Sequence, residues 1–427
     1  MRWRNNRVLL VFGLVLLGIG FGSFMAVKDQ GGLDFTLFRL ERWGRKTFHL
    51  EKPATAEEIR EAKLRAKVAT DRALAEFPDM RVQERNIPPE ENGHLRAYEL
   101  AKGEEVERLR SSSVLESLRK EASDFDAPAV RKELEAFEEL GRAIIEVAEL
   151  RQRSSTAMPD GYVGSFPSAG LKAMFDYLQL KSRVAAVEGD EEDARKYVSL
   201  AVNLVEHLRD VETPNLLSEI IVMLMDRGIR DMCFSRILPE LGGVPNLELW
   251  RAILRPPDYS PSRLAIVLKG EWFTFQAEFS SVIFIPRSGD DVPDPEHFCR
   301  AYAGLFSEKV GRLRGMDGKE LAKSGLVFSR SLSRHLSKES KHYYFLEDME
   351  SWVTAFSRAS ATTALYDAAF DLLIKERNGA NLSAITETFV RNPLTELPFD
   401  YDPSTREISE GNLSADWDIE PLTLPKL

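Results

Sequence analysis

The sequence predicts an all-α fold: an N-terminal transmembrane helix, then an irregular array of helical hairpins, then a turn-rich C-terminal tail. One observation is an uncharged apolar run at residues 8–27, whose length matches a helix that crosses the hydrocarbon core of a bilayer. Another is the stretch 168–240, where apolar residues recur with the helical period. The predicted segments are a cytoplasmic N-terminus (1–7), a transmembrane anchor (8–27), a juxtamembrane segment (28–50), an extracytoplasmic helical domain (51–400) and an acidic, turn-rich tail (401–427).

The composition is that of an ordinary globular protein with an acidic balance. The 427 residues include 57 Lys or Arg against 68 Asp or Glu, a net charge of -11, and no basic stripe offsets it. Nucleic acid is therefore not an expected partner, because binding to phosphates needs clustered cations. Of the cysteines, Cys233 is expected to be a small buried side chain, and a disulfide with Cys299 is possible outside the cytoplasm.

Charges around the apolar run predict its orientation. Arginines precede the run at Arg2, Arg4 and Arg7, whereas the charges that follow it nearly cancel. The positive-inside rule then places the N-terminus in the cytoplasm and the rest of the chain outside, as a single-pass protein of the cytoplasmic membrane. A cleaved signal peptide is the alternative. We favour an uncleaved signal anchor, because the run is long and its small-x-small site, Gly20-Phe21-Gly22, lies inside it.

The juxtamembrane segment combines aromatic and basic residues, and two interpretations stay open. It could lie against the lipid headgroups as an interfacial segment. It could equally be the first element of the folded domain. The residues in question are Phe35, Phe38, Arg39, Arg42, Trp43, Arg45, Lys46 and Phe48.

Helices are predicted from residue 55 to residue 151. Thr55 and Glu58 have the spacing of a capping box, which begins a helix that runs to about Phe77. Residues 87–93 then form a turn that leads into another helix, and 126–151 form one more. A link rich in Gly and Pro separates these helices from the central stretch.

The central stretch predicts a helical hairpin. The first helix covers 168–187, Gly189 ends it in a left-handed conformation, and Asp190 caps the second helix. Leu204 lies in the middle of the apolar stripe of the second helix and is expected to be buried. The arrangement is similar to a tetratricopeptide hairpin, although no 34-residue repeat of it occurs elsewhere in the chain.

A third helix is expected at 215–238, with Thr213 as its cap and Pro214 in its first turn. It is apolar nearly all round, with Glu219 and Asp226 as interruptions, so we expect it to be the buried helix against which the hairpin packs.

The remaining chain predicts helices separated by loops. Five prolines between 393 and 425 make the last stretch, 380–427, a poor helix former. The expected helices cover residues 246–254, 261–285, 296–310 and 347–377.

Short motifs that fall along the chain in one order carry a resemblance to a known group. They are Ile87-Pro88-Pro89-Glu90-Glu91-Asn92, Gly189-Asp190, Lys269-Gly270-Glu271, Asn392-Pro393-Leu394-Thr395 and Pro398-Phe399-Asp400-Tyr401. The order resembles that of membrane-anchored, all-helical bacterial proteins of uncharacterised function. Members have Ala where this chain has Gly93, and they differ again at Asn392 and Glu396. The resemblance implies an anchored helical fold in the bacterial inner membrane, and it implies no activity.

Motifs of known catalytic chemistry are missing from the sequence. It contains no Gly-x-Ser-x-Gly, no phosphate-binding loop, no Gly-x-Gly-x-x-Gly and no His-Glu-x-x-His. We therefore predict no cofactor and no metal. Glu271, beside Gly270 in a long apolar helix, is the one candidate catalytic residue. It is either a carboxylate in a cleft or the partner of a nearby Lys or Arg.

The expected function is that of a membrane-anchored, extracytoplasmic helical scaffold that binds a protein partner. The alternative is a membrane-anchored enzyme of the hydrolase type that uses a carboxylate such as Glu271. A concave pocket with converging polar groups would favour the enzyme. A broad apolar groove would favour the scaffold.

Overall fold

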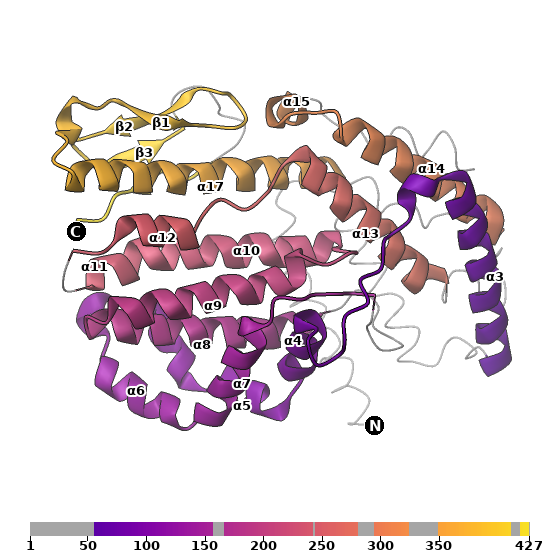
Figure 1. Ribbon diagram of the computed structural model, residues 1–427, viewed down its shortest axis with the longest axis horizontal. Helices are drawn as coiled ribbons and strands as arrows, with labels where there is room; N and C mark the ends of the chain where they lie inside the picture. Colours follow the sequence, from indigo (N-terminus) through magenta and orange to yellow (C-terminus); the bar gives the residue numbers. More distant parts are fainter. Residues whose placement is uncertain are drawn as a thin grey trace, which may run out of the picture. The chain divides into compact units, whose positions relative to one another are not determined.

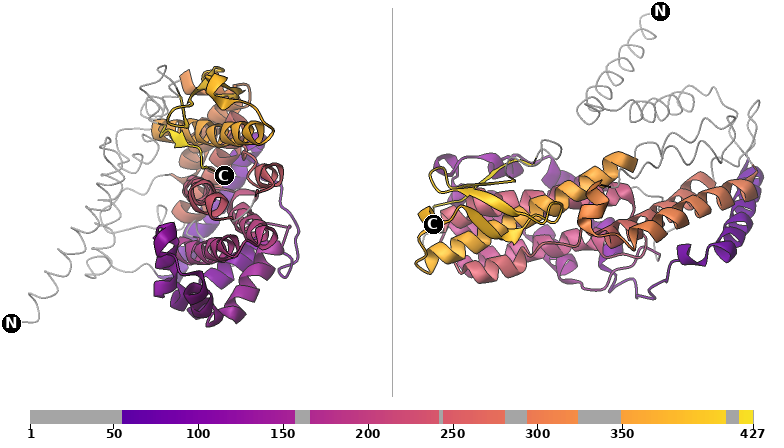
Figure 2. Two further views of the ribbon diagram at one scale, coloured as in Figure 1. Left: turned by 90° about the vertical axis from the view of Figure 1, so that its left-hand side faces the viewer. Right: turned by 90° about the horizontal axis from the view of Figure 1, so that it is seen from above.

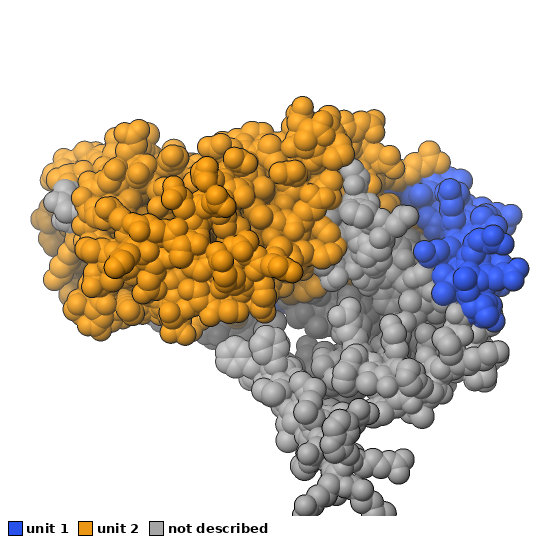
Figure 3. Space-filling view, turned by 90° about the horizontal axis from the view of Figure 1, so that it is seen from below, with its two compact units in different colours: residues 1–80, 275–308, 324–355 blue, residues 81–274, 309–323, 356–427 orange. Residues whose placement is uncertain are grey.

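The structure is a computed structural model, and it is mostly helical, which confirms the predicted fold class in outline (Figure 1). It divides into two compact units, which Figure 3 shows in different colours. Unit 1 comprises residues 1–80, 275–308 and 324–355, and unit 2 comprises residues 81–274, 309–323 and 356–427. The residues that the structure describes are 55–156, 166–241, 244–280, 294–323, 349–410 and 419–426.

The predicted transmembrane anchor (8–27) and juxtamembrane segment (28–50) lie outside the described residues. Within the part of the chain that the structure describes, no helix has the length and hydropathy needed to cross a membrane.

The centre of unit 2 is an antiparallel helical hairpin, as predicted. Helix α8 (Ser168–Val187) ends before Gly189, whose φ of 76° is the left-handed conformation that glycine adopts without strain. Helix α9 (Glu191–Arg209) begins where the Asp190 carboxylate accepts a hydrogen bond from the Asp193 N–H, at 2.9 Å. Leu204 is fully buried, so the predicted stripe of α9 faces the core.

Helix α10 (Leu216–Met232) begins later than predicted. Its cap is Asn215 rather than Thr213: the Asn215 side chain accepts from the Ser218 N–H at 2.7 Å, and the Ser218 hydroxyl accepts from the Asn215 N–H at 3.0 Å. Thr213 instead shares a hydrogen bond with the Ser155 hydroxyl, at 2.7 Å. The helix continues through a π-helical segment, η4 (Cys233–Ile237), into α11 (Leu238–Glu240).

The prediction that this third helix is buried on all sides is wrong. Leu217 and Leu224 are 51% and 62% exposed, while Glu219 is fully buried. The reason is that cations neutralise the carboxylates on the inner face. Arg263 donates to Glu219 at 2.6 Å, and Arg230 donates to Asp226 at 3.1 Å.

Short helices form the layer that packs on the other side of α8. The sequence at 126–151 folds as two helices rather than the single one predicted, because Phe137 leaves the helical conformation while its ring is buried in the core. These elements are α4 (Gly93–Ala101), α5 (Glu104–Arg110), η2 (Ser113–Arg119), η3 (Ala122–Asp124), α6 (Ala127–Glu135) and α7 (Glu138–Glu149).

A buried arginine ties this layer to the hairpin. The Arg183 guanidinium of α8 donates to the carbonyl oxygens of Ser117 and Lys120, at 3.2 and 2.8 Å. It also donates to the Glu240 carboxylate of α11, at 2.6 Å, and lies 4.0 Å from the centre of the Phe125 ring. One side chain therefore donates hydrogen bonds to carbonyl oxygens at the end of η2 and links η2 to helices α8 and α11.

Helices of the C-terminal half complete unit 2. Arg251 of α12 donates to Asp367 of α17, with Nε and Oδ1 2.7 Å apart. These elements are α12 (Leu247–Ile253), α13 (Pro261–Ser280, up to residue 274), α15 (Gly318–Lys323), α17 (Met349–Arg377, from residue 356) and η6 (Leu382–Ala384).

A four-stranded antiparallel sheet of order β1-β2-β3-β4 lies against α17 (Figure 2). Sequence analysis assigned this region to turns and does not predict the strands. They are too short for a clear alternation, yet Phe399, Tyr401 and Ile408 belong to the same buried cluster as Phe370 of α17. The strands are β1 (Glu387–Arg391), β2 (Pro398–Asp402), β3 (Glu407–Ser409) and β4 (Leu422–Thr423).

Unit 1 contains α3 (Ala56–Glu76), η1 (Pro78–Met80) and the first part of α14 (Pro295–Leu313). The predicted capping box of Thr55 and Glu58 is confirmed. Arg300 pairs with Glu76, with Nε and Oε2 2.7 Å apart, and the Ser307 hydroxyl donates to Asp79 at 2.9 Å, so polar contacts join α14 to the end of α3.

Candidate functional site

Glu271, the candidate from the sequence, lies buried on α13 and contacts the beginning of α10. Its Oε2 accepts a hydrogen bond from the Leu216 N–H at 2.9 Å. Helix α13 can approach this closely because Gly270 has no side chain: a Cβ there would lie 1.9 Å from the Pro214 carbonyl oxygen. The carboxylate therefore satisfies one of the unpaired N–H groups in the first turn of α10.

Both cysteines are free thiols and both are buried. Cys233 is fully buried in the core of unit 2, as expected, and burial raises the pKa of its thiol. Among the described residues, no group of three or more His, Cys, Asp or Glu side chains is placed to hold a metal ion.

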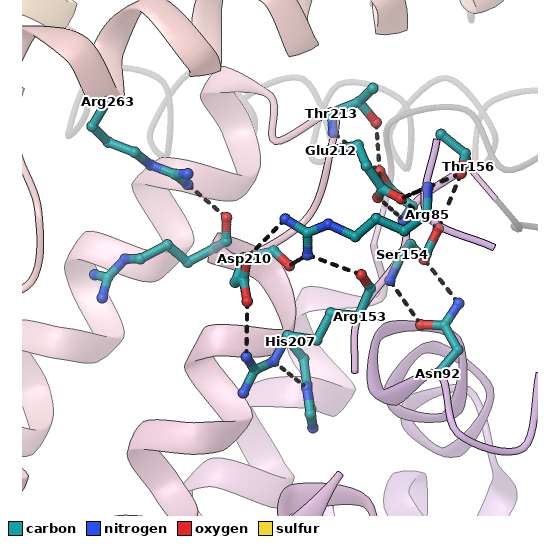
Figure 4. Close-up of polar contacts among 12 residues, drawn as sticks. Arg85, Asn92, Arg153, Ser154, Thr156, His207, Asp210, Glu212, Thr213 and Arg263 are labelled. Atoms are coloured by element: carbon teal, nitrogen blue, oxygen red, sulfur yellow. Dashed lines mark hydrogen bonds and ion pairs between the residues drawn. The ribbon is translucent and has the colours of Figure 1, made fainter. Parts of the chain in front are cut away.

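A polar cluster forms where three connecting segments meet, at residues 85–92, 152–156 and 210–213 (Figure 4). Asn92 joins the first segment to the second. Its Oδ1 accepts from the Ser154 N–H at 3.0 Å, and its Nδ2 donates to the Ser154 carbonyl at 2.9 Å. The Asn92 side chain thus pairs with a backbone as a second strand would, and it is fully buried.

Asp210, directly after α9, pairs with two arginines. Its Oδ1 accepts from Arg85 at 3.0 Å, and its Oδ2 accepts from Arg153 at 3.1 Å. Arg85 also donates to the carbonyl oxygens of Asp210 and Arg153, at 2.9 and 3.1 Å. These charge-assisted bonds hold the end of α9 against both of the other segments.

Glu212 accepts hydrogen bonds from the same two segments. Its Oε1 accepts from the Arg85 N–H and the Ser154 hydroxyl, both at 2.8 Å, and its Oε2 accepts from the Ser155 N–H at 2.8 Å. Burial opposes ionisation, but these N–H and hydroxyl donors outweigh it and hold the pKa of Glu212 below its ordinary value. The carboxylate is therefore charged and is stabilised by neutral donors.

The geometry fixes the tautomer of His207. Its Nδ1 lies 3.0 Å from Arg153 Nε, and arginine can only donate, so Nδ1 is the acceptor. The proton must then be on Nε2, which donates to the Val147 carbonyl at 2.7 Å. Burial, reinforced by the nearby Arg153 charge, lowers the pKa of His207 to about 3.

His94 lies beside His207 and is also neutral. Its Nδ1 is 2.6 Å from the His207 carbonyl oxygen, and burial lowers the pKa of His94 to about 4. Gly93 makes room for this arrangement, since a Cβ at that position would lie 2.3 Å from Cε1 of His207. An alanine at this position would not fit without a shift of the imidazole.

An open pocket of about 490 Å³ adjoins the cluster on the side of Arg85 and Asp210. Arg263, which lines it, is held by Glu219 and by the Arg209 carbonyl at 2.8 Å. The lining residues are Val82, Gln83, Glu84, Arg85, Asp210, Val211, Glu212, Arg263, Ile266 and Lys269.

Sequence reasoning pointed to some of this site and missed the rest. It singled out the turn that contains Asn92 and the motif that contains Lys269. It missed Arg85, Arg153, Asp210 and Glu212, which stand in no recognisable spacing. The sole available signal was a pair of acidic residues directly after a helix, which is common. Comparisons with protein-family models, with curated proteins and with solved structures each find no match for this chain.

Proposed function

We propose that this protein is a membrane-anchored scaffold whose domain outside the cytoplasm binds a protein partner through the exposed face of α10. The observation that carries the proposal is the pair Leu217 and Leu224, two turns apart on one helix and more than half exposed. Ile220 and Ile221 lie between them and are half-buried, so the apolar row is continuous.

The orientation of α10 supports a binding role. A helix normally buries its leucines and leaves its carboxylates in water, because burying a charge costs free energy. Here Glu219 and Asp226 are inside and the leucines are outside. A chain with Glu219 and Asp226 inside and Leu217 and Leu224 outside is less stable by itself than one with these positions exchanged. A partner that covers the two leucines would explain why this orientation exists.

The binding test compares exposed leucines on two helices, α10 and α12. Leu217→Asp and Leu224→Asp should together weaken partner binding by about thirtyfold or more, and so lower the amount of partner recovered from detergent-solubilised membranes, since each leucine contributes about 1 kcal/mol or more at an interface core. Leu249→Asp is the matched control, because Leu249 is an exposed leucine on α12. Equal recovery with both sets of variants would refute a role for α10.

The anchor is proposed from residues 8–27 and the arginines before them. Alkaline phosphatase fused after Leu427 should be active in intact bacterial cells, because the C-terminus would lie outside the cytoplasm. An inactive phosphatase fusion together with a fluorescent GFP fusion at the same position would reverse the topology.

Glu271 separates the scaffold from the hydrolase alternative. In a scaffold, Glu271→Gln weakens one helix-capping hydrogen bond and leaves partner recovery unchanged in the folded protein. A folded Glu271→Gln protein of normal abundance that behaves in cells like a deletion would instead favour the enzyme.

A further inference from the structure

We propose that the pocket beside Arg85 binds an extended peptide segment with a basic side chain, paired through its backbone with residues 82–84. The proposal rests on the proposed scaffold function, and it adds a second site and the chemistry of its ligand. The pocket is a surface distinct from the leucine row of α10, so the two sites can be tested separately.

The backbone of residues 82–84 belongs to no helix or strand, and its polar groups are available. No hydrogen bond joins its N–H or C=O groups to any other part of the described chain. The segment is nevertheless held in place directly after these residues, where the Arg85 N–H donates to Glu212 and the Arg85 side chain donates to Asp210. A segment that is anchored at one end and has free backbone donors and acceptors can pair with a peptide backbone at little ordering cost to the protein.

Apolar side chains also line the pocket. Ile266 of α13 lines the pocket and is 44% exposed, and Val82 and Val211 also line it. A volume of about 490 Å³ is within the range of small-ligand sites. The pocket can therefore take one apolar side chain of a short extended peptide beside Ile266.

The charges left unpaired at the pocket are negative. Asp210 is paired with Arg85 and Arg153, Arg263 is paired with Glu219, and Lys269 is also engaged within the chain. By contrast, neither Glu84 nor Glu212 forms an ion pair with any described side chain, and both line the pocket. A lysine or arginine of the peptide is the complementary group.

Binding can be measured with defined probes on the detergent-solubilised full chain. The probes are three fluorescein-labelled pentapeptides: Lys-Val-Lys-Val-Lys, its acidic counterpart Glu-Val-Glu-Val-Glu, and the basic peptide with its two valine amides N-methylated. Fluorescence anisotropy should show that the basic peptide binds. The acidic peptide should bind about tenfold more weakly or not at all, and N-methylation should cost about tenfold because it removes two backbone donors.

Variants locate the binding. Glu84→Lys should weaken the binding of the basic peptide by up to about fivefold, which is the contribution of an exposed ion pair. Glu90→Lys makes the same change of charge at an exposed residue outside the pocket and should leave affinity unchanged. Ile266→Trp should fill the pocket and abolish binding, whereas Phe273→Trp, at an exposed residue of the same helix that does not line the pocket, should not.

Three results would overturn the proposal. They are no binding of the basic peptide, equal binding of the basic and acidic peptides, and binding that N-methylation and Ile266→Trp leave unchanged. The failure of this site is distinguishable from the failure of the scaffold. If only the pocket is misassigned, Leu217→Asp with Leu224→Asp still reduces partner recovery while the peptides do not bind.

Discussion

Helices α9 and α10 are neighbours in sequence and pack against each other, yet they differ in the acidic residues that they bury. Helix α9 buries Leu204 and Leu208, and none of its acidic residues is buried. Helix α10 buries Glu219 and Asp226 and exposes two leucines. The difference lies in the partners, because α10 meets Arg263 from α13 and carries Arg230 on its own inner face.

The comparison shows where hydrophobic periodicity is a sufficient guide to burial. It is sufficient when the buried face of a helix is apolar, as it is around Leu204 of α9. It fails when a distant residue supplies an opposite charge to the inner face, because the pair then enters the core at a tolerable cost. Arg263 is 44 residues away from Glu219 in the sequence, so no local sequence pattern predicts that the two side chains pair.

The largest expected effect comes from placing a charge on the buried face of α9, and the same change on the exposed face of α10 is its comparison. Leu204→Asp puts an unpaired carboxylate in the core and should lower the free energy of unfolding by about 5 kcal/mol or more. Leu224→Asp, on the exposed face of α10, should change it by about 0.5 kcal/mol or less. Thermal unfolding of the solubilised chain, followed by circular dichroism, checks both. Equal melting temperatures for the two variants would remove the contrast between the helices.

Breaking the buried pair of α10 should have the next largest effect. Glu219→Ala leaves the Arg263 guanidinium buried without its carboxylate, which should cost about 3–5 kcal/mol. Glu192→Ala removes an exposed carboxylate from α9 and should cost less than about 1 kcal/mol. If urea unfolding gives similar midpoints for the two variants, the inner face of α10 does not depend on its arginine partner.

Acid should destabilise the contact between α9 and α4 through two buried histidines, His207 of α9 and His94 of α4. The pKa values of His207 and His94 are lowered to about 3 and about 4, whereas both return to about 6.5 on unfolding. The unfolded chain thus binds protons first as pH falls, so their contribution is complete above about pH 6.5 and is lost below it. By pH 5 the loss should reach roughly 2 kcal/mol for each histidine.

Urea unfolding between pH 7.5 and pH 5 measures this dependence. His94→Gln should reduce the slope of the unfolding free energy against pH by the equivalent of about one proton. His297→Gln, at an exposed residue, should leave this slope unchanged. A wild-type curve without a slope in this range would mean that the two imidazoles are accessible to water.

The smallest expected effects come from two glycines. Gly93→Ala should destabilise by about 1–3 kcal/mol, because the new methyl group meets the His207 ring. Gly228→Ala, on α10, should instead stabilise by about 0.5–1 kcal/mol, because no atom lies near the added Cβ and alanine favours a helix. Melting temperatures that move in the same direction would contradict this account.

Local chemistry was enough to predict the hairpin of α8 and α9 and the start of α3. Gly189, Asp190, Thr55 and Glu58 act on neighbouring backbone, so their effect can be read from adjacent residues. The candidate site could not be predicted in this way. Arg85 and Glu212 are 127 residues apart, and Arg153 and His207 are 54 apart, so the contacts that hold the three segments together exist only after folding.

Arg183 has a consequence for the order of events during folding. Its guanidinium joins Glu240, 57 residues later, to the carbonyls of Ser117 and Lys120, 66 and 63 residues earlier. A cation leaves water at a reasonable cost only when all its acceptors are in place. We therefore expect the contacts of α8 with η2 and with α11 to form together and late in folding, because both long loops must close first.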